Sequence, residues 1–292
     1  MAGFVPMKGR TASQKICWLA SYPKSGNTWT RILLSKLLRD DEQDDVDNLS
    51  IDLVGSIASN RIRFDALTGL PSSDMTDDEI DLLRPAANRA IAVDSEKLLY
   101  TKVHDAYHDS GNGEAIFPAD CSFGAIYIVR NPLDVAVSYA YHQGHQDFAK
   151  VIQQMNNPAH VMAGGSKSQL RQKTMGWTGH YRSWHNQTKI PILTIRYEDM
   201  IVDTVGCLAR MADFIGLDSP NLSEQIKSAV ELSRFDKLRA KEEISGFSER
   251  PEKAAKFFRS GRVGEGVERL DADLRQKMVE ANRPLMHELG YI

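Results

Sequence analysis

The residues best suited to chemistry in this chain lie in the segment 21–29, which reads SYPKSGNTW. An apolar run at 15–20 precedes it and a helical pattern at 28–39 follows, so the segment joins a predicted strand to a predicted helix. Backbone N–H groups at such a turn, together with the positive end of the helix, form a site for an anion. Lys24 adds a full positive charge, and neutral donors come from Ser25, Asn27 and Thr28. We therefore expect a phosphate-binding site here.

Two other interpretations of this turn need to be weighed. A nucleoside-triphosphate enzyme has the pattern GxxxxGK[ST], with lysine directly after the second glycine. Here Lys24 comes two residues before Gly26, which argues against a P-loop nucleotide kinase but leaves it as the alternative. The segment could also be a plain strand–helix turn with a surface lysine, because Gly and Ser are common in turns.

The rest of the chain alternates strand-like and helix-like patterns. Further strands are predicted at 98–103, 124–129 and 191–196. Helices are predicted from Pro132 onward and at 175–187, 203–215, 222–231 and 271–288. This order predicts an α/β fold, a single P-loop-like domain with a central parallel sheet flanked by helices. Two polar, glycine-containing stretches are long enough to be mobile lid loops, at 143–174 and 240–266.

Three segments resemble motifs of the sulfotransferases that use 3′-phosphoadenosine 5′-phosphosulfate (PAPS) and release 3′-phosphoadenosine 5′-phosphate (PAP). YPKSGNTW at 22–29 resembles their 5′-phosphosulfate loop, and YIVRNPLDVAVSY at 127–139 resembles their 3′-phosphate motif. FFRSGRVG at 257–264 resembles their C-terminal Arg-Lys-Gly-x-x-Gly loop. The motifs occur in family order and span most of the chain. The first loop is also similar to that of bacterial glycopeptide-antibiotic sulfotransferases, which act on natural products.

The resemblance implies catalytic roles for three residues. Lys24 would stabilise the leaving phosphate oxygen, as the matching lysine does in the family. The segment 100–104 resembles the family's Lys-Thr-His strand end, which places His104 at the general base. Lys102, two residues earlier on an extended strand, would project to the same side and bind a transferring oxygen. His108 is the alternative base.

The resemblance also assigns residues to the nucleotide. Arg130 and Ser138 match ligands of the 3′-phosphate, and Trp29 matches the tryptophan that stacks on adenine. Ser260 stands where the family has a lysine, and Arg262 could supply the missing charge. No metal is expected. The full predicted nucleotide set is Lys24, Ser25, Gly26, Asn27, Thr28, Trp29, Arg130, Ser138, Tyr197, Ser233, Phe235, Arg259, Ser260 and Gly261.

Composition bears on partners and location. The net charge of −3 argues against a general nucleic-acid binder. The three cysteines, Cys17, Cys121 and Cys207, are far apart and form no CxxC pair, which predicts a reducing, cytoplasmic compartment. The start of the chain has no long apolar stretch, so no membrane association is expected. We predict a flexible segment at 1–14 and one sulfotransferase domain at 15–292.

The acceptor is the least determined part of the prediction. A small molecule bearing a hydroxyl or amine fits the family, and the oligomeric state stays open. The acidic run at 40–47 could favour a cationic acceptor or could be an ordinary solvated surface. A non-catalytic protein that binds adenine nucleotides is a further alternative, against which the intact set Lys24, His104, Arg130 and Ser138 argues.

Overall fold

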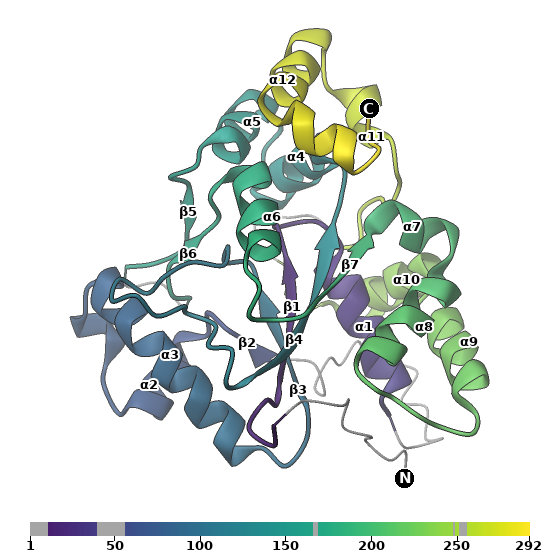
Figure 1. Cartoon of the computed structure of the whole chain (residues 1–292). Coiled ribbons are helices and arrows are strands. Elements are labelled where there is room, and N and C mark those ends of the chain that lie inside the picture. Colours follow the sequence, from purple (N-terminus) through teal and green to yellow (C-terminus); the bar gives the residue numbers. More distant parts are fainter. Residues whose placement is uncertain (1–10, 40–55, 166–168, 248, 251–255) are drawn as a thin grey trace.

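A five-stranded parallel sheet forms the centre of the computed structural model, which describes residues 11–39, 56–165, 169–247, 249–250 and 256–292 (Figure 1). The strand order is β2-β3-β1-β4-β7. The strands are β1 (Ile16–Ser21), β2 (Ser56–Ile57), β3 (Leu99–Val103), β4 (Ser122–Val129) and β7 (Ile192–Arg196). The four long strands and the parallel α/β fold confirm the sequence predictions. Sequence reasoning did not find β2, since two residues are too few to show a period.

Helices follow the strands in the alternating order that the sequence predicts. The helices that confirm predicted ones are α1 (Asn27–Leu37), α4 (Pro132–His142), α6 (Gly176–Asn186), α8 (Thr204–Phe214), α9 (Leu222–Leu232) and α12 (Ala272–Glu288). The others are α2 (Arg61–Thr68), α3 (Asp77–Asp94), α5 (Phe148–Asn156), α7 (Tyr197–Val202), α10 (Phe235–Ser245) and α11 (Glu265–Arg269). None of the described helices combines the length and apolarity that crossing a membrane requires.

The predicted loop at 143–174 is wrong in part. Helix α5 lies within it, as does a short antiparallel pair formed by β5 (Val161–Met162) and β6 (Gln172–Lys173). The Asp147 carboxylate accepts from the Lys150 backbone N–H and caps α5. Val151, Ile152 and Met155 are buried at helical spacing, so packing of this face stabilises the helix within a polar segment. In the second predicted loop, 240–266, α10 extends to Ser245 and α11 begins at Glu265.

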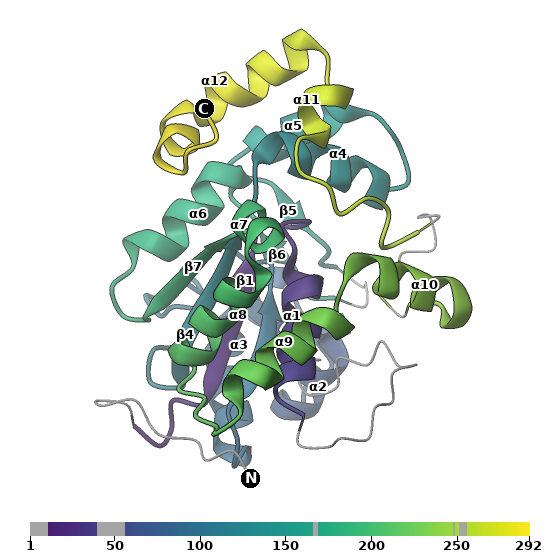
Figure 2. The same cartoon turned by 90° about the vertical axis from the view of Figure 1, so that its right-hand side faces the viewer.

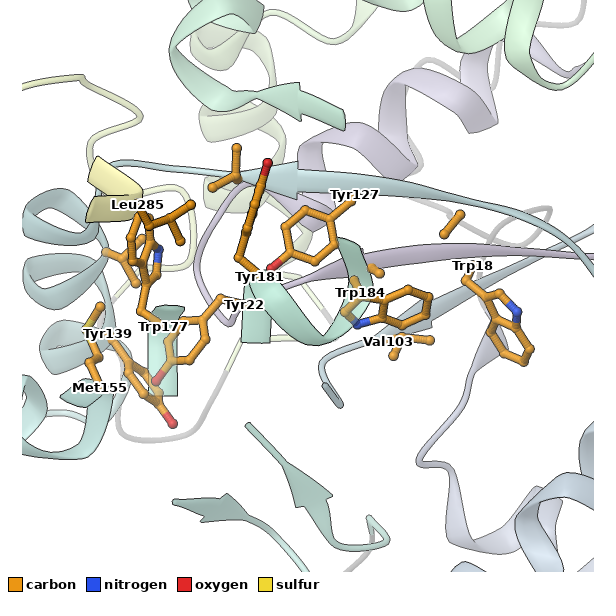
Figure 3. Close-up of a cluster of buried hydrophobic side chains, with 14 of the residues drawn as sticks. Trp18, Tyr22, Val103, Tyr127, Tyr139, Met155, Trp177, Tyr181, Trp184 and Leu285 are labelled. Carbon is orange, nitrogen blue, oxygen red and sulfur yellow. The ribbon is translucent and has the colours of Figure 1, made fainter. Parts of the chain in front are cut away.

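Side chains of β1 alternate between two cores, one on each face of the sheet. Ile16, Trp18 and Ala20 belong to a core that also contains side chains of α4, α5, α6 and α12. Cys17 and Leu19 pack on the face covered by α1, α7, α8 and α9, which Figures 1 and 2 place together on one side. Figure 3 shows the first core, where aromatic rings such as Trp18, Tyr127 and Trp184 fill the space against the sheet. The sheet is therefore buried on both faces, as parallel sheets are.

The register of the sheet brings the ends of four strands to one edge. Ala20 pairs with Val103, Ser21 with Ile128, and Val129 with Arg196. Both views show α4, α5, α11 and α12 gathered beyond this edge (Figures 1 and 2). Residues that follow β1, β3, β4 and β7 therefore meet there, which is where open α/β folds bind ligands.

Candidate active site

A cavity of about 740 Å³ opens at this carboxyl edge of the sheet. It collects residues from all three sequence motifs and from the end of β3. The predicted site residues that line it are Lys24, Gly26, Asn27, Thr28, Trp29, Lys102, His104, Arg130, Ser138, Tyr197, Phe235, Arg259, Ser260 and Gly261. Ser25 and Ser233 are fully buried and lie outside the lining. Folding thus joins segments from both ends of the chain in one site.

The turn between β1 and α1 has a backbone shape that only certain residues permit. Gly26 has φ of 107°, and a Cβ there would come within 2.6 Å of the Tyr197 ring. Lys24 also has positive φ, 68°. The Asn27 amide donates to the Leu19 carbonyl at 2.7 Å, so this side chain turns back to the sheet and secures the turn. Its backbone N–H lies in the first turn of α1, where N–H groups have no partner within the helix.

Contacts with Ser233 and Tyr197 fix the position of the Trp29 side chain. Its Nε1 donates to the Ser233 carbonyl at 2.9 Å, and its ring meets Tyr197 edge-to-face with centroids 5.9 Å apart. The Ser233 hydroxyl is buried and has no hydrogen-bond partner among the described residues. Ser233 therefore contributes to the site through the backbone support of Trp29, while Phe235 reaches the cavity wall directly.

His104 lies at the end of β3 with its ring orientation fixed. Its Nδ1 lies 2.9 Å from the Ser21 backbone carbonyl. A carbonyl only accepts, so Nδ1 carries the proton and Nε2 carries the lone pair. Burial first, and then the Lys102 charge, lower the pKa of His104 to about 3. The imidazole is therefore neutral, and its acceptor nitrogen Nε2 has no hydrogen-bond partner in the part of the chain that the structure describes.

The alternative base, His108, lies in a different environment. It is buried outside the cavity lining, with its Nδ1 2.7 Å from the Asp109 carbonyl and its Nε2 3.8 Å from the Asp105 carboxylate. Asp105 is itself paired with Arg84 at 2.8 Å. This buried cluster anchors the chain that follows β3, and it does not present His108 to the cavity.

Lys24 enters the cavity among other cations. These cations are Lys102, Arg130 and Arg259. Burial first, and then the charges of these three residues, lower the pKa of the Lys24 ammonium to about 7. Its Nζ lies 3.3 Å from His142 Nδ1 and 4.7 Å from the centre of the Phe257 ring. Sequence reasoning did not single out His142, although it stands four residues after Ser138 and therefore on the same helix face.

Glu249 is a second residue that sequence reasoning missed. Its carboxylate contacts Arg31 at 2.5 Å, Lys102 at 3.2 Å and the Thr28 hydroxyl at 3.3 Å. Burial opposes its negative charge, but the charges of Lys102 and Arg31 outweigh this and lower the pKa of Glu249 to about 2. The Glu249 carboxylate thus contacts Lys102 and Thr28, two residues that are predicted to bind anionic groups of PAPS. Nothing in the charged stretch around it distinguishes Glu249 in the sequence.

Arg130 connects the first loop to the C-terminal loop. Its guanidinium donates to the Lys24 carbonyl at 3.3 Å and to the Arg262 carbonyl at 2.9 Å, and it lies 4.3 Å from the centre of the Tyr197 ring. Arg130 Nε is buried without a hydrogen-bond partner among the described residues. Ser138 lines the same cavity from α4. The arrangement leaves a buried cationic donor for an anionic ligand.

The C-terminal loop forms part of the cavity wall through Arg259, Ser260 and Gly261. Arg259 makes two hydrogen bonds of 2.6 Å to Glu265. Gly261 has φ of 66°, a Cβ there would lie 2.6 Å from the Phe235 ring, and its carbonyl accepts from the Tyr197 hydroxyl at 2.9 Å. The suggestion that Arg262 replaces the lysine absent at Ser260 finds no support, since its side chain is 58% exposed and pairs with Glu268.

The residues present fit an anionic adenine nucleotide. The first turn of α1 presents N–H groups without a partner in the helix, and Arg130 Nε is a buried donor without a partner among the described residues. Gly26 and Gly261, where a Cβ would clash, allow the backbone to approach a ligand closely. Within the described ranges, no three His, Cys, Asp or Glu side chains gather in a way that could hold a metal ion. The acidic run at 40–47 lies outside the described residues, so its suggested role toward a cationic acceptor stays a prediction.

A parallel sheet with an anion turn after its central strand and a cationic cavity at its edge defines a P-loop-like nucleotide-binding enzyme. The family model described as "Sulfotransferase domain" matches residues 14–290. The chain therefore belongs to the sulfotransferase family and is a PAPS-dependent sulfotransferase.

Individual relatives show the same similarity. The chain is 26% identical over 279 residues to flavonol 3-sulfotransferase of Flaveria bidentis. The aligned region covers 89% of this chain and 81% of that protein. It is 28% identical to sulfotransferase 1E1 of Rattus norvegicus over 162 residues, about half of each chain (53% and 52%). Among solved structures, retinol dehydratase in complex with androsterone and inactive cofactor PAP has a TM-score of 0.63 at 19% identity, covering 96% of this chain and 82% of that one. Mouse sulfotransferase SULT7A1 complexed with PAP has a TM-score of 0.58 at 19% identity, covering 95% and 85%. These two structures support the fold.

Proposed function

We propose that this enzyme transfers the sulfuryl group of PAPS in line to a hydroxyl or amine of a small-molecule acceptor, with His104 as general base and Lys24 on the leaving group. The observation that carries the proposal is that a neutral His104 with a free Nε2 and the Lys24 ammonium line the same cavity. The names of the relatives, which include a flavonol sulfotransferase and a retinol dehydratase, support a small organic acceptor.

The residues of this chain act on two parts of the reaction, the leaving phosphate and the attacking acceptor. PAPS supplies a sulfuryl group bonded to a phosphate oxygen. As that bond breaks, negative charge builds on the phosphate, where the Lys24 ammonium and the N–H groups of α1 can stabilise it. As the acceptor oxygen or nitrogen bonds to sulfur, its proton passes to His104 Nε2. In this proposal Lys102 binds a transferring oxygen, and Arg130 with Ser138 holds the 3′-phosphate.

The experiment that tests the proposal is a transfer assay with PAPS and pooled metabolites, in which products are found by the added mass of one sulfuryl group. PAP in place of PAPS serves as the control. We expect PAPS-dependent products. Hydrolysis of a nucleoside triphosphate with no sulfated product would favour the P-loop kinase instead, while tight PAP binding without transfer would favour a non-catalytic binding protein.

The pH dependence of kcat/KM for PAPS should show one basic limb. Because the Lys24 ammonium has a pKa of about 7, its charged form is present below pH 7 and is lost as pH rises, so kcat/KM should fall toward tenfold per pH unit above that value. His104, with a pKa of about 3, stays neutral throughout this range. Lys24→Arg keeps its charge, so its slower reaction should lack this limb. An identical limb in Lys24→Arg would contradict the assignment.

Arg130→Ala should weaken PAP binding by about 2–4 kcal/mol, because it removes a charge-assisted contact in a buried anion site. Wild type should bind PAP far more tightly than adenosine 5′-phosphate, and the variant should lose most of that difference. Calorimetry with both nucleotides gives the comparison. Arg262→Ala, whose side chain points outward to Glu268, is the matched control and should bind PAP normally. Equal affinity of wild type for the two nucleotides would rule out the 3′-phosphate site.

Glu249→Gln should bind PAP roughly fivefold more tightly, a gain of about 1 kcal/mol. The native carboxylate competes with anionic ligands for Lys102 and Thr28, whereas an amide of the same shape does not. The ligand-free variant should also melt earlier, because buried Arg31 loses a charged partner. Glu268→Gln, at an exposed position on α11, is the control. Weaker PAP binding by Glu249→Gln would show that this carboxylate assists the site.

Several finer predictions stay open beside this proposal. They are the cytoplasmic location, the choice between O- and N-sulfation, the absence of nucleic-acid and membrane partners, and the boundary between a flexible segment at 1–14 and the domain at 15–292. Of the first segment, the structure describes residues 11–14, where the Ser13 hydroxyl donates to the Asp120 carbonyl at 3.0 Å.

A further inference from the structure

His142 is the last residue of α4 and lines the cavity one helical turn beyond Ser138. Its Nδ1 lies 3.3 Å from Lys24 Nζ. A lysine ammonium has three donors and no acceptor, so the imidazole nitrogen must accept in this contact. The remaining ring proton then lies on Nε2. His142 is thus a neutral acceptor for Lys24, contributed by the helix that also carries part of the predicted 3′-phosphate motif.

We propose that His142 is a positioning residue for Lys24, which holds the lysine ammonium in the place where charge develops on the leaving phosphate. The inference rests on the proposed function of Lys24. It concerns how the lysine is held, which none of the three sequence motifs addresses.

Lys24 needs such a partner because three of the four charges that act on it are cations that repel it, and the Glu249 carboxylate, which attracts it, hydrogen-bonds Lys102 and Thr28 instead. The charges that act on it come from Lys102 on β3, Arg130 after β4, Arg259 in the C-terminal loop, and the single carboxylate of Glu249. The Phe257 ring attracts the ammonium by its face but offers no directional acceptor. Among the described residues, His142 is the one that hydrogen-bonds Nζ. Without it, a flexible four-carbon side chain would lose its preferred orientation.

The neutrality of His142 suits this role. A carboxylate in its place would hold Lys24 more firmly, but it would cancel the charge that Lys24 must deliver to the leaving group. A protonated imidazole would repel the lysine. Burial first, and then the charges of Lys24 and Lys102, lower the pKa of His142 to about 3, while Glu249 acts weakly in the opposite sense. The ring therefore stays neutral at every pH at which Lys24 titrates, and it orients the ammonium without neutralising it.

The two cavity histidines also differ in tautomer. His104 donates from Nδ1 to a carbonyl and leaves Nε2 bare, whereas His142 accepts at Nδ1 and carries its proton on Nε2. His104 can therefore take a proton at Nε2, whereas Nε2 of His142 already carries one. Their roles are therefore not interchangeable, and substitution of His142 should not mimic loss of the base.

The test uses the full-length enzyme and the variants His142→Phe and His142→Asn. Phe keeps the bulk but removes the acceptor, while the Asn carbonyl oxygen can replace Nδ1. The first measurement is the pKa of the Lys24 amine, obtained by NMR of lysine-labelled protein and assigned with Lys24→Arg. Removing an acceptor from an ammonium disfavours its charged form, so His142→Phe should lower this pKa by about half to one unit. His142→Asn should restore it.

The second measurement is steady-state kinetics with PAPS, together with calorimetric binding of PAP. His142→Phe should lose about tenfold in kcat while PAP affinity stays within about threefold, since a misplaced group affects the transition state more than ground-state binding. His142→Asn should recover most of the rate. His145→Phe, three residues further on and outside the cavity lining, is the matched control and should behave as wild type.

The outcomes separate this inference from the proposed function. An unchanged Lys24 pKa in a folded His142→Phe variant overturns the positioning role, whatever the activity. A changed pKa with unchanged kcat overturns it as well, because the contact would then not serve the reaction. A wild type that transfers no sulfuryl group would count against the proposed function alone, since the NMR titration does not depend on turnover.

Discussion

Replacing Lys24 with alanine is expected to lower kcat at saturating PAPS by about 10²–10³-fold, the usual loss when one donor to a developing negative charge is removed. PAP affinity should change much less, because the turn's backbone N–H groups and Arg130 remain. The physical reason is that charge on the leaving phosphate is greatest in the transition state, where the ammonium contributes most. Single-turnover rates and calorimetric PAP binding, measured on the same preparation, provide the comparison.

Two results would change this view of Lys24. If kcat stayed near the wild-type value and PAP affinity fell, Lys24 would be a ground-state ligand of the nucleotide. If both stayed unchanged, the cavity would not be the transfer site. Lys150→Ala removes an exposed lysine from α5 and serves as the control for loss of one positive charge at the surface.

His104→Ala is expected to lower the transfer rate by about 10²–10⁴-fold, the range over which a positioned general base contributes. The side chain lies at the end of β3 with Nε2 free, while its backbone carbonyl is held separately by His180 Nε2 at 3.2 Å. Truncation should therefore leave the strand end in place and remove only the base. Rates against pH for wild type and the variant, with an acceptor found in the transfer assay, measure the effect.

The control for this experiment is His108→Ala. His108 is buried beside Asp105, so its loss should reduce stability while leaving the rate per folded molecule nearly unchanged. Loss of transfer in His108→Ala with retention in His104→Ala would move the base to His108. If neither change mattered, the acceptor would be acidic enough to need no base, or a carboxylate would serve. A series of acceptors of increasing acidity separates these cases, since the need for a base falls as the acceptor's own pKa falls.

The sequence was sufficient to predict the four long strands and the turn between β1 and α1 for physical reasons. A parallel strand buried on both faces is a continuous apolar run, which is how β1 and β4 read. Gly26 and the donors around it mark the turn, and Pro132 marks the start of α4. Once these strands are parallel neighbours, their ends must meet at one edge. The convergence of Lys24, His104 and Arg130 follows from that rule rather than from any single residue.

Side-chain direction was harder to predict than position. Asn27 and Ser233 both belong to the predicted set, yet one turns back toward the sheet and the other supports Trp29 through its carbonyl. Arg262 lies in the right loop but points outward. Glu249 reaches Arg31 and Lys102 from a distant part of the chain. These outcomes depend on which elements pack together, and a single sequence without spatial neighbours does not contain that information.

The central place of β1 has a consequence for how the molecule is made. This strand lies near the start of the chain, yet its two partners, β3 and β4, follow much later. During synthesis both edges of β1 therefore stay unpaired until β3 and β4 have been made, and strands with unpaired edges tend to aggregate. Contacts between such distant segments also slow folding. Since the lining of the cavity also includes Arg259 and Gly261, a nucleotide bound there would bind only the completed fold and would stabilise it by mass action, by about 2.7 kcal/mol at a hundred times its Kd.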